Sequence, residues 1–255
     1  DRYLADSGSI ATVDKLGKGS FAKLKGKVKE RLFAIASDII AIAAKRELTK
    51  GIYIDTTKEE IQVLQGGAGF DYTKDQTRSV KEFLTDMSSG LVMDRLLSGD
   101  VGFGKTEVAM NGMLAVLLNG FQSLFICPTT LLSSQHFEGI KNRLEPFGFK
   151  IAKLDGRTST KDRNAIKKSL EEGQIDLVVG THALLNVKCK NLALVVVDEE
   201  HKFGVKQKEK LKDIRSDVHI FSMSATPIPR TLNLAMSKIK GMSSLLTPPS
   251  ERLGV

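Results

Sequence analysis

Length, composition and charge limit what this chain can be. Its 255 residues, 41% of them hydrophobic, are enough for one large α/β domain or for one domain with an appendage. Its apolar stretches are shorter than the ~20 residues of a membrane-spanning helix and its first residues do not resemble a secretion signal, which predicts a cytoplasmic protein without a membrane partner. Its net charge of +8 favours a polyanionic partner.

The first 69 residues carry no catalytic motif. Residues 1–19 are polar and glycine-rich, and because the chain begins with Asp and not Met, we interpret them as the remnant of a preceding domain or linker. Apolar residues at spacings of three and four then predict a long amphipathic helix over 20–50. Its basic start fits a surface that docks on a membrane, a nucleic acid or a protein, but more commonly marks the solvated face of a connecting helix. Residues 51–69 include Gly66-Gly67-Ala68-Gly69 and are typical of a linker.

An aromatic residue and a glutamine surround the start of the next predicted helix. Thr73 suits an N-cap, and the helix carries an apolar face with Val80, Phe83, Leu84 and Met87. The amide of Gln76 could hydrogen-bond both edges of an adenine while Phe70, six positions earlier, stacks on its face. The alternative is that Phe70 is only a hydrophobic anchor before a helix.

The clearest motif lies between a predicted strand over 95–98 and a predicted helix over 107–118. It reads Gly99-Asp100-Val101-Gly102-Phe103-Gly104-Lys105-Thr106, with four residues between two glycines followed by Lys and Thr, which is the spacing of a P-loop. In such a loop Lys105 neutralises the β- and γ-phosphates, and the Thr106 hydroxyl at the start of a helix can bind Mg²⁺. The sequence therefore predicts a nucleoside triphosphate site, with a Gly-rich turn and an incidental lysine as the alternative.

Downstream of the P-loop helix, apolar strands alternate with helices. We predict helices over 130–144 and 161–171 and strands over 122–127, 150–154, 175–180, 194–197 and 219–224. This alternation indicates an α/β fold with a parallel sheet covered by helices on both faces, whose ligands bind at the carboxyl ends of the strands. Polar segments follow the strands as expected, namely Pro128-Thr129-Thr130, Gly180-Thr181-His182, Asp198-Glu199-Glu200-His201 and Ser224-Ala225-Thr226.

The segment Asp198-Glu199-Glu200-His201 follows the apolar strand Val195-Val196-Val197. A carboxylate delivered by a strand beside a P-loop is suited to hold Mg²⁺, directly or through water, so Asp198 is the predicted metal residue. Glu199, one residue further, is placed to orient and deprotonate the water that attacks the γ-phosphate. A solvated acidic turn is the alternative, and His201 could contact Glu199, contact the later Ser-Ala-Thr segment, or be an ordinary turn histidine.

Two of these segments, Asp198-Glu199-Glu200-His201 and Ser224-Ala225-Thr226-Pro227-Ile228-Pro229-Arg230, resemble the first motor lobe of superfamily-2 helicases and translocases. Within that superfamily, the P-loop region and residues 201–205 are similar to two families, the bacterial transcription-repair coupling factors and the branch-migrating fork-reversal helicases. Residues 103–107, 231–237 and 247–249 resemble the coupling factors more closely. The resemblance implies a RecA-like P-loop NTPase fold, helicase lobe 1, over 70–255, preceded by a connecting helix and by what is left of a polymerase-interacting domain.

The resemblance also implies a function. It implies an ATP-dependent translocase on double-stranded DNA that displaces stalled RNA polymerase and recruits excision-repair proteins, with ATP and Mg²⁺ as cofactors. It assigns catalysis to Lys105, Asp198 and Glu199, metal binding to Thr106 and Asp198, and adenine binding to Phe70 and Gln76. It further assigns DNA-backbone contacts to Thr129, Thr130, Gln135, Thr181 and His182, and coupling of hydrolysis to movement to His201, Ser224, Thr226 and Arg230. Lys74 and Ser133 depart from the family pattern, which has Pro and usually Ala at these positions.

Two other functions fit parts of the pattern. A fork-reversal helicase would share this lobe, although the basic connecting helix favours a coupling factor. A nucleotide-dependent switch protein would share the P-loop but would not need the Pro-Thr-Thr and Gly-Thr-His segments. For either motor, we expect residues 1–255 alone to be nearly inactive as an ATPase, because superfamily-2 motors supply the catalytic arginine from a second lobe and Arg230 belongs to the coupling segment.

Overall fold

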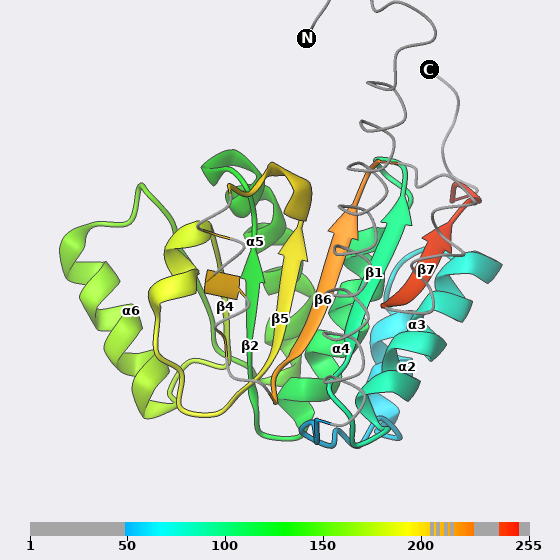
Figure 1. The fold of residues 1–255 in the computed structure, drawn as a ribbon, viewed down its shortest axis with the longest axis horizontal. Coiled ribbons are helices and arrows are strands. Elements are labelled where there is room, and N and C mark those ends of the chain that lie inside the picture. The colour runs from blue at the N-terminus through cyan, green and yellow to red at the C-terminus, as the bar shows by residue number, and fades with distance from the viewer. Residues whose placement is uncertain are drawn as a thin grey trace, which may run out of the picture. The chain divides into compact units, whose positions relative to one another are not determined.

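The computed structural model describes residues 49–204, 207, 210, 211, 214, 217–226 and 240–249 (Figure 1). The predicted domain remnant over 1–19, nearly all of the predicted helix over 20–50, Arg230 and the segment 231–237 lie outside these residues. Lys50, predicted as the last helical residue, instead forms an isolated antiparallel bridge with Leu91. No helix in the described ranges is both long enough and apolar enough to cross a bilayer.

The described part of the chain forms a seven-stranded parallel sheet in the order β3-β4-β2-β5-β6-β1-β7 (Figure 1). The strands are β1 (Asp94–Gly99), β2 (Gln122–Ile126), β3 (Ile151–Leu154), β4 (Leu177–Gly180), β5 (Leu192–Asp198), β6 (His219–Ser224) and β7 (Gly241–Leu245). The predicted parallel sheet is therefore confirmed, because each predicted strand is present and pairs in parallel with its neighbours. β7 was not predicted, since it has only two large apolar residues and pairs only with β1 at the edge.

Helices cover both faces of this sheet. They are α2 (Glu59–Gly66), α3 (Lys74–Met87), α4 (Lys105–Leu118), α5 (Thr130–Leu144) and α6 (Thr160–Glu172), with short 3₁₀ helices η1 (Glu145–Phe147), η2 (His182–Asn186) and η3 (Glu200–Lys202). Successive side chains of β5 point to opposite faces, so Val196 packs with α3 and α4 in one core while Val195 packs with Leu170 of α6 in the other. The continuous apolar run of β5 follows from burial on both sides.

Local sequence explains where the helices begin. The Thr73 side chain accepts from the Gln76 N–H at 3.2 Å while the Gln76 side chain accepts from the Thr73 N–H at 2.8 Å, which completes a capping box at α3. Thr129 and Ser159 cap α5 and α6 in one direction only, by accepting from the N–H groups of Leu132 and Asp162. The segment 51–69, predicted as a linker, contains α2 and buries Ile54, Ile61 and Leu64 in the core beside α4, so it is packed structure.

Strand register brings distant motifs together. Ser98 at the start of the P-loop pairs with Ser224, and Asp198 pairs with Met223, so the loops that follow β1, β5 and β6 are neighbours. On the other side of β5, Gly180 pairs with Ile126 of β2 and with Leu154 of β3. The sheet order therefore separates the polar segments into two adjacent groups at the carboxyl edge.

Candidate functional site

The P-loop connects β1 to α4 and depends on glycine at its last turn. Gly104 has φ +81°, and a Cβ there would lie 2.3 Å from Nε2 of Gln76. Lys105, the first residue of α4, donates from Nζ to the carbonyls of Gly99 at 2.6 Å and Asp100 at 3.0 Å. Burial lowers the pKa of Lys105, while the nearby Glu199 and Asp198 carboxylates oppose that shift. The lysine side chain therefore folds over the loop from which it extends.

Gln76 supports this loop from behind. Its side chain is fully buried and donates from Nε2 to the Phe103 carbonyl at 3.0 Å, in addition to its bond with the Thr73 amide. Gln76 is not among the residues that line the pocket in front of the P-loop, whereas half-buried Phe70 is. Of the two predicted adenine-binding side chains, Phe70 therefore lines the pocket, whereas Gln76 is bonded to the P-loop backbone. Adenine recognition by both residues stays a prediction.

Two contacts fix the wall of the pocket around Phe70. Tyr72, whose ring stacks on Phe70 at 6.0 Å, donates its hydroxyl to Glu107 at 2.6 Å, and Arg143 of α5 donates to the same carboxylate oxygen at 2.6 Å. On the other side, Asp75 accepts from the backbone N–H groups of Leu246 and Thr247 at 2.9 and 3.0 Å. This second contact holds the segment that ends in Pro249, which also lines the pocket.

The acidic segment after β5 is bonded directly to the segment after β6. Glu199 has φ +51° and ψ +51°, and among the described residues it is the one non-glycine residue with positive φ. Its N–H donates to the Met223 carbonyl at 2.9 Å, and its Oε1 accepts from the Ala225 N–H at 2.8 Å. His201 Nδ1 lies 3.2 Å from Glu199 Oε2, so of the contacts considered for His201 the one with Glu199 is present. The hydroxyls of Ser224 and Thr226, the residues on either side of Ala225 in sequence, lie 2.6 Å apart.

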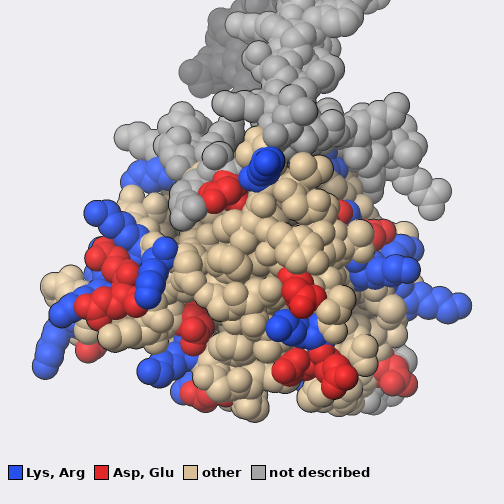
Figure 2. Space-filling model, turned by 90° about the horizontal axis from the view of Figure 1, so that it is seen from below, with Lys and Arg blue, Asp and Glu red and all other residues tan. Residues whose placement is uncertain are grey.

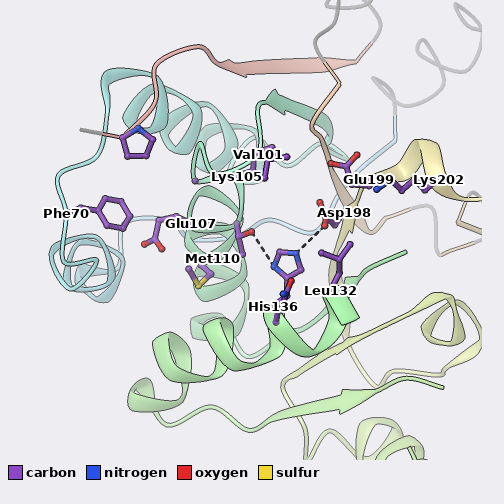
Figure 3. Close-up of a pocket in the computed structure, with 15 residues that line it drawn as sticks. Phe70, Val101, Lys105, Glu107, Met110, Leu132, His136, Asp198, Glu199 and Lys202 are labelled. Carbon is purple, nitrogen blue, oxygen red and sulfur yellow. Dashed lines mark hydrogen bonds and ion pairs between the residues drawn. The ribbon is translucent and has the colours of Figure 1, made fainter. Parts of the chain in front are cut away.

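His136 is a pocket residue that the sequence analysis did not assign to the nucleotide site. Its Nε2 lies 3.2 Å from Asp198 Oδ2 and its Nδ1 lies 3.4 Å from Thr106 Oγ1, so one imidazole joins two predicted metal-binding residues (Figure 3). The signal that could have found it is helical spacing: Leu132 and His136 are four residues apart on α5 and both line the pocket.

These groups surround a pocket of about 560 Å³ (Figure 3). It is lined by Phe70, Val101, Gly102, Gly104, Lys105, Thr106, Glu107, Met110, Leu132, Gln135, His136, Asp198, Glu199, Lys202 and Pro249. The donor set fits Mg²⁺, because the Thr106 hydroxyl and the Asp198 carboxylate are hard oxygen ligands. The described residues contain no cluster of three or more His, Cys, Asp or Glu side chains that could hold a metal, so a cation here needs phosphate and water oxygens as well.

The predicted DNA-contacting residues are distributed differently. Thr129 and His182 are exposed and Thr130 is half-buried, but Thr181 is only 4% exposed, and Gln135, although exposed, lines the pocket. Arg157, an exposed cation just after β3, lies beside this group and was not predicted. At the opposite edge, where the strands begin, Figure 2 shows Lys and Arg interspersed with Asp and Glu around a broad uncharged area, so that face is no basic patch.

The chain matches a known family and several curated proteins. The sequence pattern of the DEAD/DEAH box helicase family matches residues 73–235. The chain is 58% identical over 251 residues, 98% of its length, to the transcription-repair-coupling factor of Helicobacter pylori. It is 39% identical over 256 aligned residues, 100% of its length, to the transcription-repair-coupling factor of Escherichia coli. Since these alignments cover 25% and 22% of the relatives, the chain spans about a quarter of their length.

Solved structures show the same fold. RecG bound to a three-way DNA junction matches with a TM-score of 0.76 and 36% identity, covering 89% of this chain and 31% of RecG. A DEAD box protein from Methanococcus jannaschii matches with a TM-score of 0.57 and 24% identity over 73% of this chain and 53% of that protein, a likeness of fold alone. The predicted RecA-like helicase lobe and the resemblance to coupling factors are therefore confirmed. The chain belongs to the DEAD/DEAH box helicase family, and over nearly its whole length it is similar to transcription-repair-coupling factors.

Proposed function

We propose that this chain is the ATP-binding lobe 1 of a double-stranded DNA translocase that acts in transcription-coupled excision repair. The observation that carries the proposal is the meeting of Lys105, Asp198 and Glu199 around one pocket, in a chain 58% identical to a coupling factor. The domain division follows the same proposal: lobe 1 over 70–255, a connecting helix that begins near residue 20 and ends before Thr49, and a remnant of a polymerase-interacting domain over 1–19. RNA polymerase and excision-repair proteins are the proposed partners.

The pocket residues divide the work of ATP hydrolysis. Lys105 neutralises the β- and γ-phosphates, and Thr106 and Asp198 hold Mg²⁺. When bound, the metal supplies positive charge to the phosphate oxygens. Glu199 orients the attacking water and accepts its proton as the water oxygen bonds to the γ-phosphorus and the bond to the β-phosphate oxygen breaks. Its contact with the Ala225 N–H fixes the carboxylate for that role.

The same contact supports a coupling role for the segment after β6. Glu199 accepts a hydrogen bond from Ala225, whose neighbours in sequence are Ser224 and Thr226, and it contacts His201, so a change at the γ-phosphate would reach this segment through hydrogen bonds. Arg230 belongs to the same proposed coupling element. DNA would be gripped by phosphate contacts from Thr129, Thr130 and the loop of Thr181 and His182, without sequence readout.

Fork reversal is the second candidate, favoured by the 36% identity to RecG, which was solved on a DNA junction. The test compares the full-length protein on two substrates under ATP: RNA polymerase stalled on a duplex, and a synthetic three-way junction. We expect ATP-dependent release of polymerase and little junction conversion, with the Glu199→Gln variant inactive on both. Efficient junction conversion without polymerase release would reverse the assignment, and activity on neither substrate would refute both candidates.

Residues 1–255 alone should hydrolyse ATP poorly. An arginine finger contributes about 10³–10⁵ in rate, and in superfamily-2 motors it comes from a second lobe that also closes on the nucleotide. The comparison is DNA-stimulated turnover by residues 1–255 and by a chain extended through a second lobe. Equal rates would mean that the catalytic arginine lies within these residues.

A further inference from the structure

One histidine spans the two side chains to which the proposed function assigns Mg²⁺. His136 lies on α5, outside both the P-loop and the acidic segment, yet its two ring nitrogens approach Thr106 and Asp198 at 3.4 and 3.2 Å (Figure 3). The Asp198 side chain is 9% exposed and that of His136 is 18% exposed, so water competes little for either bond. The arrangement places an imidazole directly behind the oxygen atoms that would face the cation.

Hydrogen-bond chemistry fixes which nitrogen donates. An ionised carboxylate only accepts hydrogen bonds, so Nε2 of His136 carries the proton that it shares with Asp198. In the neutral imidazole the other nitrogen then has no proton, and Nδ1 accepts from the Thr106 hydroxyl. In this tautomer the Thr106 hydroxyl proton is directed at His136, which leaves the lone pairs of Thr106 Oγ1 for a cation.

The ring is held by β2 and α5, which lie outside the P-loop and the acidic segment. Phe125 of β2, which is fully buried, packs against it with ring centroids 4.9 Å apart and planes tilted by 47°. Leu132, one turn earlier on α5, lines the same pocket. Because β2 pairs with β5, Phe125 and Asp198 belong to adjacent strands, and the imidazole has a fixed position relative to the carboxylate.

We propose that His136 is a positioning residue of the Mg²⁺ site: it orients the Thr106 hydroxyl and the Asp198 carboxylate through its opposite ring nitrogens. The inference rests on the proposed function and adds to it a residue that joins the two proposed metal ligands. Groups that orient metal ligands in this way change metal affinity by about 10–100-fold when they are removed. Loss of the bonds to Thr106 and Asp198 should therefore weaken Mg²⁺ binding but leave the affinity for nucleotide without metal unchanged.

Three variants separate packing from hydrogen bonding. His136→Phe keeps an aromatic ring against Phe125 but removes both nitrogens. His136→Asn places a polar atom near the position of Nδ1, and His136→Gln places one near that of Nε2. If orientation is the role, His136→Phe is defective and at least one of the two amide variants recovers part of the loss.

The measurement is the affinity of the full-length protein for a fluorescent non-hydrolysable ATP analogue, titrated with MgCl₂ and repeated in EDTA. In EDTA, we expect His136→Phe to bind the analogue with the affinity of the parent. In MgCl₂, we expect the variant to need about tenfold more Mg²⁺ than the parent to reach half of the metal-dependent gain in affinity. Mn²⁺ binding followed by electron paramagnetic resonance in the presence of the analogue should show the same weakening.

Two outcomes overturn the inference while leaving the proposed function intact. If His136→Phe has the Mg²⁺ dependence of the parent, the histidine does not position the site. If it loses affinity equally in EDTA and in Mg²⁺, with no recovery in the amide variants, its role is packing alone. Failure of the parent to bind the analogue with any Mg²⁺ dependence would instead refute the proposed function.

Discussion

The two groups of loops at the carboxyl edge of the sheet differ in how they are held. Loops after β1, β5 and β6 are bonded to one another and to the helices behind them: Glu199 to Ala225, Gln76 to Phe103, His136 to Asp198. Loops after β2 and β3 use side chains locally, as when Asp155 accepts from the Arg157 N–H two residues later at 2.8 Å. The first group surrounds the pocket, and the second exposes Thr129 and Arg157, as the loop after β4 exposes His182.

The difference matches what the proposed function requires of each group. Phosphoryl transfer depends on groups that are already in place when charge develops, so a network of mutual hydrogen bonds suits the loops at the pocket. Phosphate contacts on DNA carry no sequence information and tolerate small adjustments, so locally stabilised loops are sufficient there. Substitutions should therefore have sharp, distinct effects in the first group and small, graded effects in the second.

The largest effects should come from Lys105 and Glu199, two of the charged residues that line the pocket. Lys105→Ala removes the cation from the β- and γ-phosphates and should lower nucleotide affinity by about 10–100-fold. Glu199→Gln should preserve nucleotide affinity and lower turnover by about 10²–10⁴-fold, because only the proton acceptor is lost. Calorimetry with a non-hydrolysable analogue and steady-state ATPase assays on the full-length protein measure the two effects. Unchanged affinity in Lys105→Ala would remove the basis of the P-loop assignment.

Much of this pocket and of the sheet was predictable because the signals are local. The P-loop spacing, the apolar run of β5 and the N-cap at Thr73 each lie within a few residues of sequence, and each is present in the structure. His136 was missed because its partners Thr106 and Asp198 are 30 and 62 residues away and meet only through the sheet order. β7 was missed for the same reason: its place is set by pairing with β1, not by its own composition.

Helix packing gives a second test of the comparison, because α4 follows a loop of the first group and α5 follows a loop of the second. In α4, a Cβ at Gly112 would lie 2.2 Å from the ring of Phe83, which itself stacks on Phe221 at 4.0 Å. Gly112→Ala should therefore destabilise the chain by about 1–3 kcal/mol through overpacking behind the P-loop. Gly139 on α5 has nothing within 4 Å of a Cβ, so the matched Gly139→Ala should be neutral or stabilise by up to about 1 kcal/mol. Urea unfolding measures both, and equal effects would show that the two helices are packed alike.

The amino edge of the sheet should make stability depend on pH. His219 is fully buried; its Nδ1 accepts from the Met93 N–H at 3.0 Å and its Nε2 donates to the Ile52 carbonyl at 2.7 Å. Burial lowers the pKa of His219 below its usual 6.5, against smaller opposing effects of the Ile52 bond, Asp86 and Asp217.

Between the folded and unfolded pKa values of His219 the unfolded chain binds more protons, so stability should fall as pH drops below about 6.5. The free energy of unfolding should fall by about 1 kcal/mol, because protonation of His219 Nδ1 removes the hydrogen bond that it accepts from the Met93 N–H. Urea unfolding from pH 5 to 7.5 would show it, and His219→Gln should flatten the profile. An unchanged profile in that variant would assign the pH dependence to other groups.

The smallest effects should come from the loops proposed to face DNA, where one exposed and one buried threonine form a matched pair. Thr129 caps α5 by accepting from the Leu132 N–H at 3.3 Å, which leaves its hydroxyl proton to donate to a phosphate, whereas Thr181 is 4% exposed. Thr129→Ala should weaken duplex binding about 2–10-fold, equally on unrelated sequences, with Thr129→Ser close to the parent and Thr181→Ser without effect.

None of these threonine changes should alter the salt dependence of binding, because a hydroxyl carries no charge. Arg157→Ala, in contrast, should reduce the slope of log affinity against log salt by about 0.9. Fluorescence anisotropy of the full-length protein on two duplexes at two salt concentrations distinguishes these outcomes. A loss confined to one sequence would mean that these loops read bases.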